Sequence, residues 1–312
     1  MRKRDCKVFN LNEKRPQVLL LGNGLTYGTG LPWYKLIQQV ARVDVDVHQY
    51  ERKNKEGKVV GFHVPNTVLT MATSETDDTR RHNKYGQAFE NADYTPNKWL
   101  KKLLEMPFDA VLTTNYTCEL ETALLSEYQT FKPEKKRKYA YQTGNVSDAK
   151  YLIHTFNRIW DNNPDIWHIH GELRRPSSII LSHDEYARLI CRILNYNEDR
   201  GRKYDKDREG LAFESWIDYF LLGNVYTLGL SFDFSDIDLW WLLGRRLREK
   251  TGKGIFIFYE PEKEGNYYKH LALSDSGVDV RTCGITIRKN DEYDCFYEMA
   301  IHNIEKQLRK QR

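Results

Sequence analysis

The chain has 312 residues, a formal net charge of +4, and a composition that is 40% hydrophobic and 29% charged. It is long enough to bury a sizeable core, and no stretch approaches the ~20 apolar residues of a membrane helix. The mild charge permits acidic ligands such as phosphates but does not indicate nucleic acid. The charged N-terminus, MRKRDCKVFN, lacks the apolar segment of a signal peptide, so we expect a cytoplasmic protein without a membrane partner.

The first half of the chain combines two apolar strands with a polar region. QVLLLGNG predicts a buried strand at residues 18–21 that enters a glycine turn, and LPWYKLIQQVA predicts a helix with Pro32 in its first turn. Residues 44–98 are charged and poorly periodic, which indicates an insertion or small subdomain. A helix over 98–106 and a strand over 109–114 then follow.

The second half alternates strands and helices. Ser182 or Asp184 is expected to cap the helix that follows residue 181. The patterns predict strands at 165–171, 178–181, 224–230, 254–260 and 283–289, and helices at 118–128, 182–194, 213–222, 236–250 and 293–308.

This alternation predicts an α/β protein with a Rossmann-like parallel sheet and helices on both faces. We expect one domain over residues 1–312, interrupted by a small polar and helical insertion at about 44–98. Polar residues follow Leu21, Leu112 and two later strands, and ligands of such sheets bind outside the carboxyl ends of the strands. Together these strand ends predict one pocket.

Cysteine usage argues against a structural metal site. The five cysteines are odd in number and show no CxxC spacing, and the nine histidines show no HExxH pattern. We therefore expect neither a disulfide scaffold nor zinc. The cysteines are Cys6, Cys118, Cys191, Cys283 and Cys295.

Three short motifs could carry chemistry, and each also fits a purely structural role. The turn GNGLTYG could let backbone amides approach a phosphate or could simply be tight, and its GxGxxxG spacing departs from the dinucleotide fingerprint. In HIHG we expect only one histidine to face a cleft, and the neighbouring Gly171 favours His170. After Gly229 and Ser231, which could bind a ribose or phosphate, Asp236 and Asp238 are expected to cap a helix dipole.

In their order along the chain, these motifs resemble those of the sirtuin-like family. Thr117 stands where the family usually has aspartate, and the later strand end IFIFYEPE lacks the family's asparagine. The matching segments are Gly22-Asn23-Gly24-Leu25-Thr26, Gly30-Leu31-Pro32-Trp33, Thr113 to Thr117, His170-Gly171 and Gly229-Leu230-Ser231.

Between the asparagine motif and the Gly-Ser strand end, sirtuin deacylases carry a four-cysteine zinc ribbon, whereas this chain has only Cys191 besides Cys118, which directly follows the motif. It therefore looks like the zinc-free branch found in bacterial anti-phage systems such as Thoeris, whose members cleave NAD+. The resemblance implies that Asn115 positions the ribose and a water and that His170 acts as the base. It implies NAD+ contacts at Gly22, Asn23, Gly24, Thr26, Pro32, Trp33, Thr114, Thr117, Gly229 and Ser231.

Two other functions stay open at this point: a Rossmann oxidoreductase, supported only by the glycine turn, and a non-catalytic nucleotide-binding module. The resemblance also implies control of an NAD+-cleaving activity. Because the motifs occupy most of the chain, we expect control by homo-oligomerisation or by a separately encoded partner, such as an ATPase or a nuclease-like protein.

Overall fold

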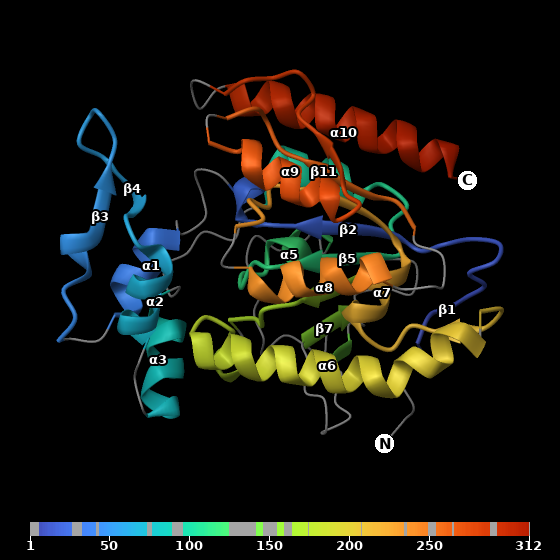
Figure 1. Cartoon of the computed structure of the whole chain (residues 1–312), viewed down its shortest axis with the longest axis horizontal. Coiled ribbons are helices and arrows are strands. Elements are labelled where there is room, and N and C mark those ends of the chain that lie inside the picture. The colour runs from blue at the N-terminus through green and yellow to red at the C-terminus, as the bar shows by residue number, and fades with distance from the viewer. Residues whose placement is uncertain are drawn as a thin grey trace.

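A large sheet forms the centre of the computed structural model (Figure 1). The residues that the structure describes are 6–26, 33–41, 44–73, 77–88, 96–124, 142–145, 155–158, 164–173, 175–206, 208–233, 236–248, 254–263, 265–287 and 292–311.

Eight described strands form this sheet in the order β12-β11-β10-β2-β5-β8-β7-β6. The first six run parallel, and β7 and β6 are antiparallel additions at one edge. The Rossmann-like fold prediction is therefore confirmed. The strands are β12 (Asp279–Arg281), β11 (Phe256–Tyr259), β10 (Asn224–Leu228), β2 (Gln17–Leu21), β5 (Ala110–Thr113), β8 (Asp165–His168), β7 (Thr155–Arg158) and β6 (Gln142–Asn145).

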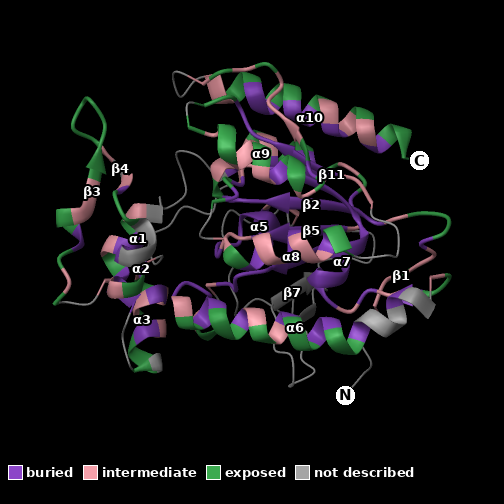
Figure 2. Ribbon diagram, viewed as in Figure 1, coloured by how far each residue is buried: buried purple, intermediate pink, exposed green. Residues whose placement is uncertain are grey.

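The register aligns the ends of the central strands. Leu21 pairs with Leu228 on one side and with Thr113 on the other, and Thr113 pairs with His168. Strands β2, β5 and β11 are buried along their whole length, as Figure 2 shows, because their residues are almost all apolar. The chain segments that follow β10, β2, β5 and β8 therefore all leave the sheet where the carboxyl ends of these strands meet.

Helices cover both faces of the sheet because alternate strand residues point to opposite sides. Val18 and Leu20 pack with one helical layer, whereas Leu19 and Leu21 pack with the other. The first layer consists of α6 (His183–Lys206), α7 (Trp216–Leu222) and α8 (Ile237–Arg248), with Leu273 of α9 (Tyr267–Asp275). The second consists of α4 (Lys98–Leu104), α5 (Glu119–Leu124) and α10 (Glu292–Lys310).

A third apolar cluster lies beside the sheet, at the left of Figure 1. This arrangement supports our proposal that an insertion at about 44–98 interrupts a single domain, although the helix before the insertion also joins the cluster. The cluster joins residues of α1 (Trp33–Val40), η2 (Val47–Tyr50), β4 (Val59–Phe62), α2 (Pro65–Thr73) and α3 (Asp78–Ala88) with Tyr116, Ile179 and Leu181. Strand β3 (Glu51–Lys53) pairs with β4.

Two predicted strands are wrong. Of residues 178–181, the first ends a short 3-10 helix, η4 (Pro176–Ser178), and the others follow it. The amide of Ile180 donates to the carbonyl of His170, which lies in a turn and not in a strand. The last strand is β12 rather than 283–289, because Cys283 and Gly284 adopt positive φ angles of 57° and 65° that end an extended chain. Residues 288 and 289 lie outside the described ranges.

The cap of α6 follows the sequence prediction. The hydroxyl of Ser182 accepts from the amide of Glu185, whose carboxylate accepts in return from the amide of Ser182. The sequence patterns missed several elements, including α9, β6, β7 and the pair formed by β1 (Val8–Phe9) and β9 (Leu211–Ala212).

No helix in the described ranges combines the length and the apolar character needed to cross a membrane.

Candidate functional site

The glycine turn after β2 packs directly on the backbone that follows β10. The amides of Gly22 and Gly24 donate to the carbonyls of Leu228 (3.3 Å) and Gly229 (2.7 Å). A Cβ atom on Gly22 or Gly24 would lie 2.6 or 2.7 Å from the carbonyl oxygen of Gly229, which itself has φ +68°. The glycines are thus needed for close backbone approach. Their binding of a phosphate stays a prediction, and these two amides already have acceptors.

The other predicted residues of this turn are placed less fully. Asn23 is exposed at the start of the 3-10 helix η1 (Asn23–Thr26). Only the backbone of Thr26 and Trp33 is described, and Pro32 lies outside the described residues. Tyr297 of α10 donates to the carbonyl of Gly24 at 2.7 Å and so fixes the turn from the opposite side.

The segment after β5 holds Asn115 in a fixed backbone position. The amide of Thr114 donates to Leu21 (3.1 Å), and the amide of Asn115 donates to the hydroxyl of Thr113 (3.0 Å). The carbonyl of Asn115 accepts from Nδ1 of His168 at 2.8 Å. Its side-chain oxygen, Oδ1, is buried and has no hydrogen-bond partner among the described residues. The backbone is therefore hydrogen-bonded to both neighbouring strands, whereas Oδ1 of the side chain stays available as an acceptor.

Asn115 and Thr117 share a small cavity with the glycine turn. Its volume is about 10 Å³, and among the residues that line it are Gly22, Asn115, Thr117 and Glu119. Burial raises the pKa of Glu119 to about 7, even though a hydrogen bond with the side chain of Thr117 lowers it. Three of the predicted site residues are thus brought together, and Glu119 is an addition that the sequence did not single out.

Gly24, Gly229 and Ser231 line a second cavity, of about 120 Å³, at the ends of β10 and β11. Its wall includes Glu260, whose carboxylate lies 2.7 Å from Nζ of Lys269 and 2.8 Å from Nε2 of His270. Four aromatic side chains complete much of the remaining wall: Tyr259, Tyr293, Phe296 and Tyr297. This combination suits a ligand with a flat apolar part and polar groups.

His170 lies in the turn after β8, paired with an aspartate. Nε2 donates to Oδ2 of Asp238 at 3.0 Å, and Nδ1 lies 3.5 Å from the hydroxyl of Tyr186. The histidine is 3% exposed and the aspartate is fully buried. Burial lowers the pKa of His170, but the charge and hydrogen bond of Asp238 outweigh it, so the pKa is raised. His170 lines neither of the two cavities above.

Asp238 corrects one sequence interpretation, because the aspartate assigned to helix capping is the partner of His170. Asp236 lies nearby, and burial raises its pKa to about 7, although the charge of His170 lowers it. The local sequence carried no usable signal for this role, because Ile237 beside Asp238 is exposed and the partner His170 lies 68 residues away.

His168 faces the opposite side of the sheet from His170. Residues two apart on a regular strand share a face, but β8 ends at His168 and the following turn, with Gly171 at φ +90°, redirects the chain. Nε2 of His168 lies 2.7 Å from the Glu121 carboxylate. Burial lowers the pKa of His168, but Glu121 outweighs it and raises the pKa to about 9. His168 therefore holds the Asn115 backbone as a charged, buried group.

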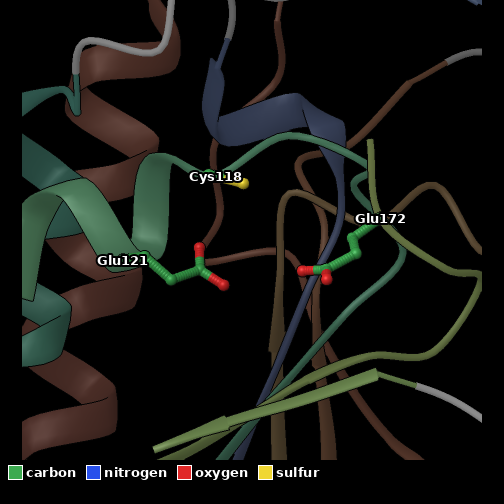
Figure 3. A group of neighbouring side chains, drawn as sticks. All are labelled: Cys118, Glu121 and Glu172. Carbon is green, nitrogen blue, oxygen red and sulfur yellow. The ribbon is translucent and has the colours of Figure 1, made fainter. Parts of the chain in front are cut away.

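Glu121 also belongs to a buried group with Cys118 and Glu172 (Figure 3). One potential ligand atom from each of the three residues lies within 4.8 Å of the others. The side chains point toward one space from α5, from the residue that precedes it, and from the turn after β8. Thiolate and carboxylate groups can bind a metal ion, but one oxygen of Glu121 is already engaged by His168. We assign no metal to this group.

The family model of the SIR2-like domain matches residues 109–280, which is more than half of the chain. The chain belongs to the SIR2-like domain family. This confirms the sirtuin-like resemblance and indicates an NAD-related enzymatic function. Asn115, His170 and Gly229 lie within the matched part of this SIR2-like protein, whereas the glycine turn precedes it. A comparison with curated proteins finds no match.

Proposed function

We propose that this SIR2-like protein is an NAD+ glycohydrolase, which cleaves the bond between nicotinamide and ribose and needs no zinc. The observation that carries the proposal is His170, a buried histidine bonded to Asp238 at the sheet edge where Asn115 and the glycine turn also lie. A histidine held in this way is a suitable general base, because the aspartate orients the ring and stabilises its protonated form.

Departure of nicotinamide leaves positive charge on the ribose, as in glycoside hydrolysis. In the proposed mechanism, Asn115 positions the ribose and a water molecule, and Nδ1 of His170 accepts a proton from that water. Nε2 cannot take this role while it donates to Asp238. Gly229 and Ser231 hold the adenosine side through the larger cavity that they line. Thr114 and the residues of the glycine turn complete the proposed NAD+ contacts.

The proposal is tested by incubating the purified protein with NAD+ and resolving the products by chromatography. We expect nicotinamide together with ADP-ribose or its cyclic form. Appearance of reduced nicotinamide cofactor with a hydride donor would identify an oxidoreductase instead. NAD+ binding measured by calorimetry without any product would identify a nucleotide-binding module.

The resemblance to anti-phage proteins extends the proposal to biology. We propose that the enzyme depletes NAD+ in the cytoplasm as an effector of anti-phage defence. Because unregulated cleavage would harm the host cell, its activity is controlled by homo-oligomerisation or by a separately encoded partner, such as an ATPase or a nuclease-like protein. Size-exclusion chromatography with parallel NAD+ assays tests this control, and a fully active monomer without a partner would contradict it.

A further inference from the structure

Within the part of the chain that the structure describes, two buried oxygen atoms at one cavity have no hydrogen-bond partner. They are Oδ1 of Asn115 and Oε1 of Glu119, and both are hidden from solvent. Their residues line the cavity of about 10 Å³ beside Gly22 and Thr117. Leaving a buried acceptor unpaired lowers stability, and two of them around one space create a local demand for a hydrogen-bond donor.

Glu119 is held so that one carboxylate oxygen is engaged and the other is not. Its side chain is 3% exposed, and its carboxylate accepts hydrogen bonds from the side chain of Thr117 and from its own backbone amide. Since Oε1 has no partner in the described ranges, these bonds engage the other oxygen. Thr117, the residue to which the family resemblance gives a ligand contact, is thus used to position Glu119.

The chemistry of the two acceptors limits the group that fits. Two acceptor oxygens are complementary to a group with two N–H donors, and a primary amide –NH2 is such a group. A cavity of about 10 Å³ has room for one water-sized group. The cavity would therefore hold the –NH2 of an amide, while the rest of the ligand stays outside it.

We propose that Glu119 and Asn115 together accept hydrogen bonds from the carboxamide –NH2 of nicotinamide. The identity of the ligand rests on the proposed NAD+ glycohydrolase function, whereas the demand for a group with two hydrogen-bond donors rests on the cavity alone. Glu119 then recognises the leaving group of NAD+ by its amide. It takes over the role of the family's aspartate, at whose position this chain has Thr117.

The test compares the affinity for nicotinamide with that for 3-acetylpyridine, which has the same ring but no N–H donor. Binding is measured by calorimetry on the full chain. At about pH 8.5, where Glu119 with its pKa of about 7 is ionised, we expect the wild type to bind nicotinamide at least ~10-fold more tightly, because a charged acceptor strengthens the bond. Glu119→Leu, which fills the site with an apolar side chain, should bind the two ligands equally. Glu119→Gln, which keeps a neutral acceptor, should retain part of the preference.

Glu105→Gln is the control, because it removes an exposed carboxylate at the end of α4 and should keep the full preference. Equal affinities in the wild type, binding of neither ligand, or an intact preference in Glu119→Leu would each overturn the assignment. The measurement needs no turnover, so it separates the two proposals. A Glu119-dependent preference without NAD+ cleavage would support the subsite and refute the hydrolase. Cleavage of NAD+ without any preference for nicotinamide would support the hydrolase and refute the subsite.

Discussion

The two ring nitrogens of His170 have different surroundings, and this difference defines its proposed role. Nε2 is bonded to Asp238 at 3.0 Å, whereas the only contact of Nδ1 among the residues that the structure describes is the hydroxyl of Tyr186 at 3.5 Å. A carboxylate can only accept, so Nε2 carries a proton and Nδ1 is the nitrogen that can receive one. Asp238 is therefore a positioning residue that acts through His170.

Replacing Asp238 by Asn should change both the rate and its pH dependence. Asn keeps the shape but removes the charge that raises the pKa of His170. We expect kcat to fall by ~10-fold or more and the acidic limb of the pH–rate profile to move to lower pH, because a base is active above its own pKa. Initial rates of NAD+ loss between pH 5 and 9 provide the measurement. An unchanged acidic limb would show that Asp238 does not set the basicity of His170.

The residues at the site differ in how far the sequence could predict them. Asn115 and His170 follow apolar strands, so their place at the sheet edge could be predicted from local pattern. The pairing of His170 with Asp238 joins positions 68 residues apart, and no local pattern reports such a contact. Glu119 lies in CELETALL, where an acidic residue at a helix start normally indicates only a favourable dipole interaction.

At the scale of elements, the contact between the glycine turn and the end of β10 depends on the absence of side chains. A Cβ atom on Gly229 would lie 2.7 Å from the amide nitrogen of Leu25, and its φ of +68° disfavours any other residue. The contact links two of the strand ends that form the candidate site. Disturbing it should affect stability and ligand binding together.

Gly229→Ala should therefore lower the melting temperature and weaken NAD+ binding. Gly244→Ala is the matched control, because Gly244 lies within α8 with no atom within 4 Å of the added Cβ. In a helix interior, that change should stabilise the protein by about 0.5–1 kcal/mol. Thermal melts and calorimetry with NAD+ distinguish the two variants. If Gly229→Ala melts at or above the wild-type temperature, the backbone contact is not under the inferred constraint.

Apolar runs in the sequence predicted the central strands and most of the covering helices, because burial on both faces leaves a continuous hydrophobic signal. The prediction failed where tertiary contacts decide. Residues 178–181 read as a strand, yet they bond to the turn at His170 and to the Tyr116 hydroxyl. Strand β12 has only three residues, none of them fully buried, so it left little signal in the sequence.

At the scale of the whole molecule, three buried groups and the half-buried Asp236 hold protons more tightly in the folded than in the unfolded chain. The pKa values of Glu119 and Asp236 rise to about 7 from 4.5 and 3.8, that of His168 rises from 6.5 to about 9, and that of His170 is also raised. A group that binds protons more tightly when folded loses stabilising effect as pH rises from its unfolded to its folded pKa.

The melting temperature should accordingly fall between pH 5 and 9. The two carboxyl groups act between about pH 4 and 7, and the two histidines act above pH 6.5. Since each pKa unit is worth about 1.4 kcal/mol, the fall should reach several degrees. Thermal melts across this range provide the measurement, and Glu119→Leu should flatten the part below pH 7. A melting temperature that rises from pH 5 to 9 would refute the inferred charge states.

The initial rate of NAD+ loss in His170→Ala and Asn115→Ala, compared with the wild type, tests the central claim most directly. His302→Ala, which removes an exposed histidine on α10, serves as the control and should keep the wild-type rate. Circular dichroism and thermal melts establish that each variant is folded. We predict that both site variants lose ~10²–10⁴-fold in rate while they remain folded. Near wild-type turnover in either folded variant would contradict the assignment of His170 and Asn115 as the catalytic pair.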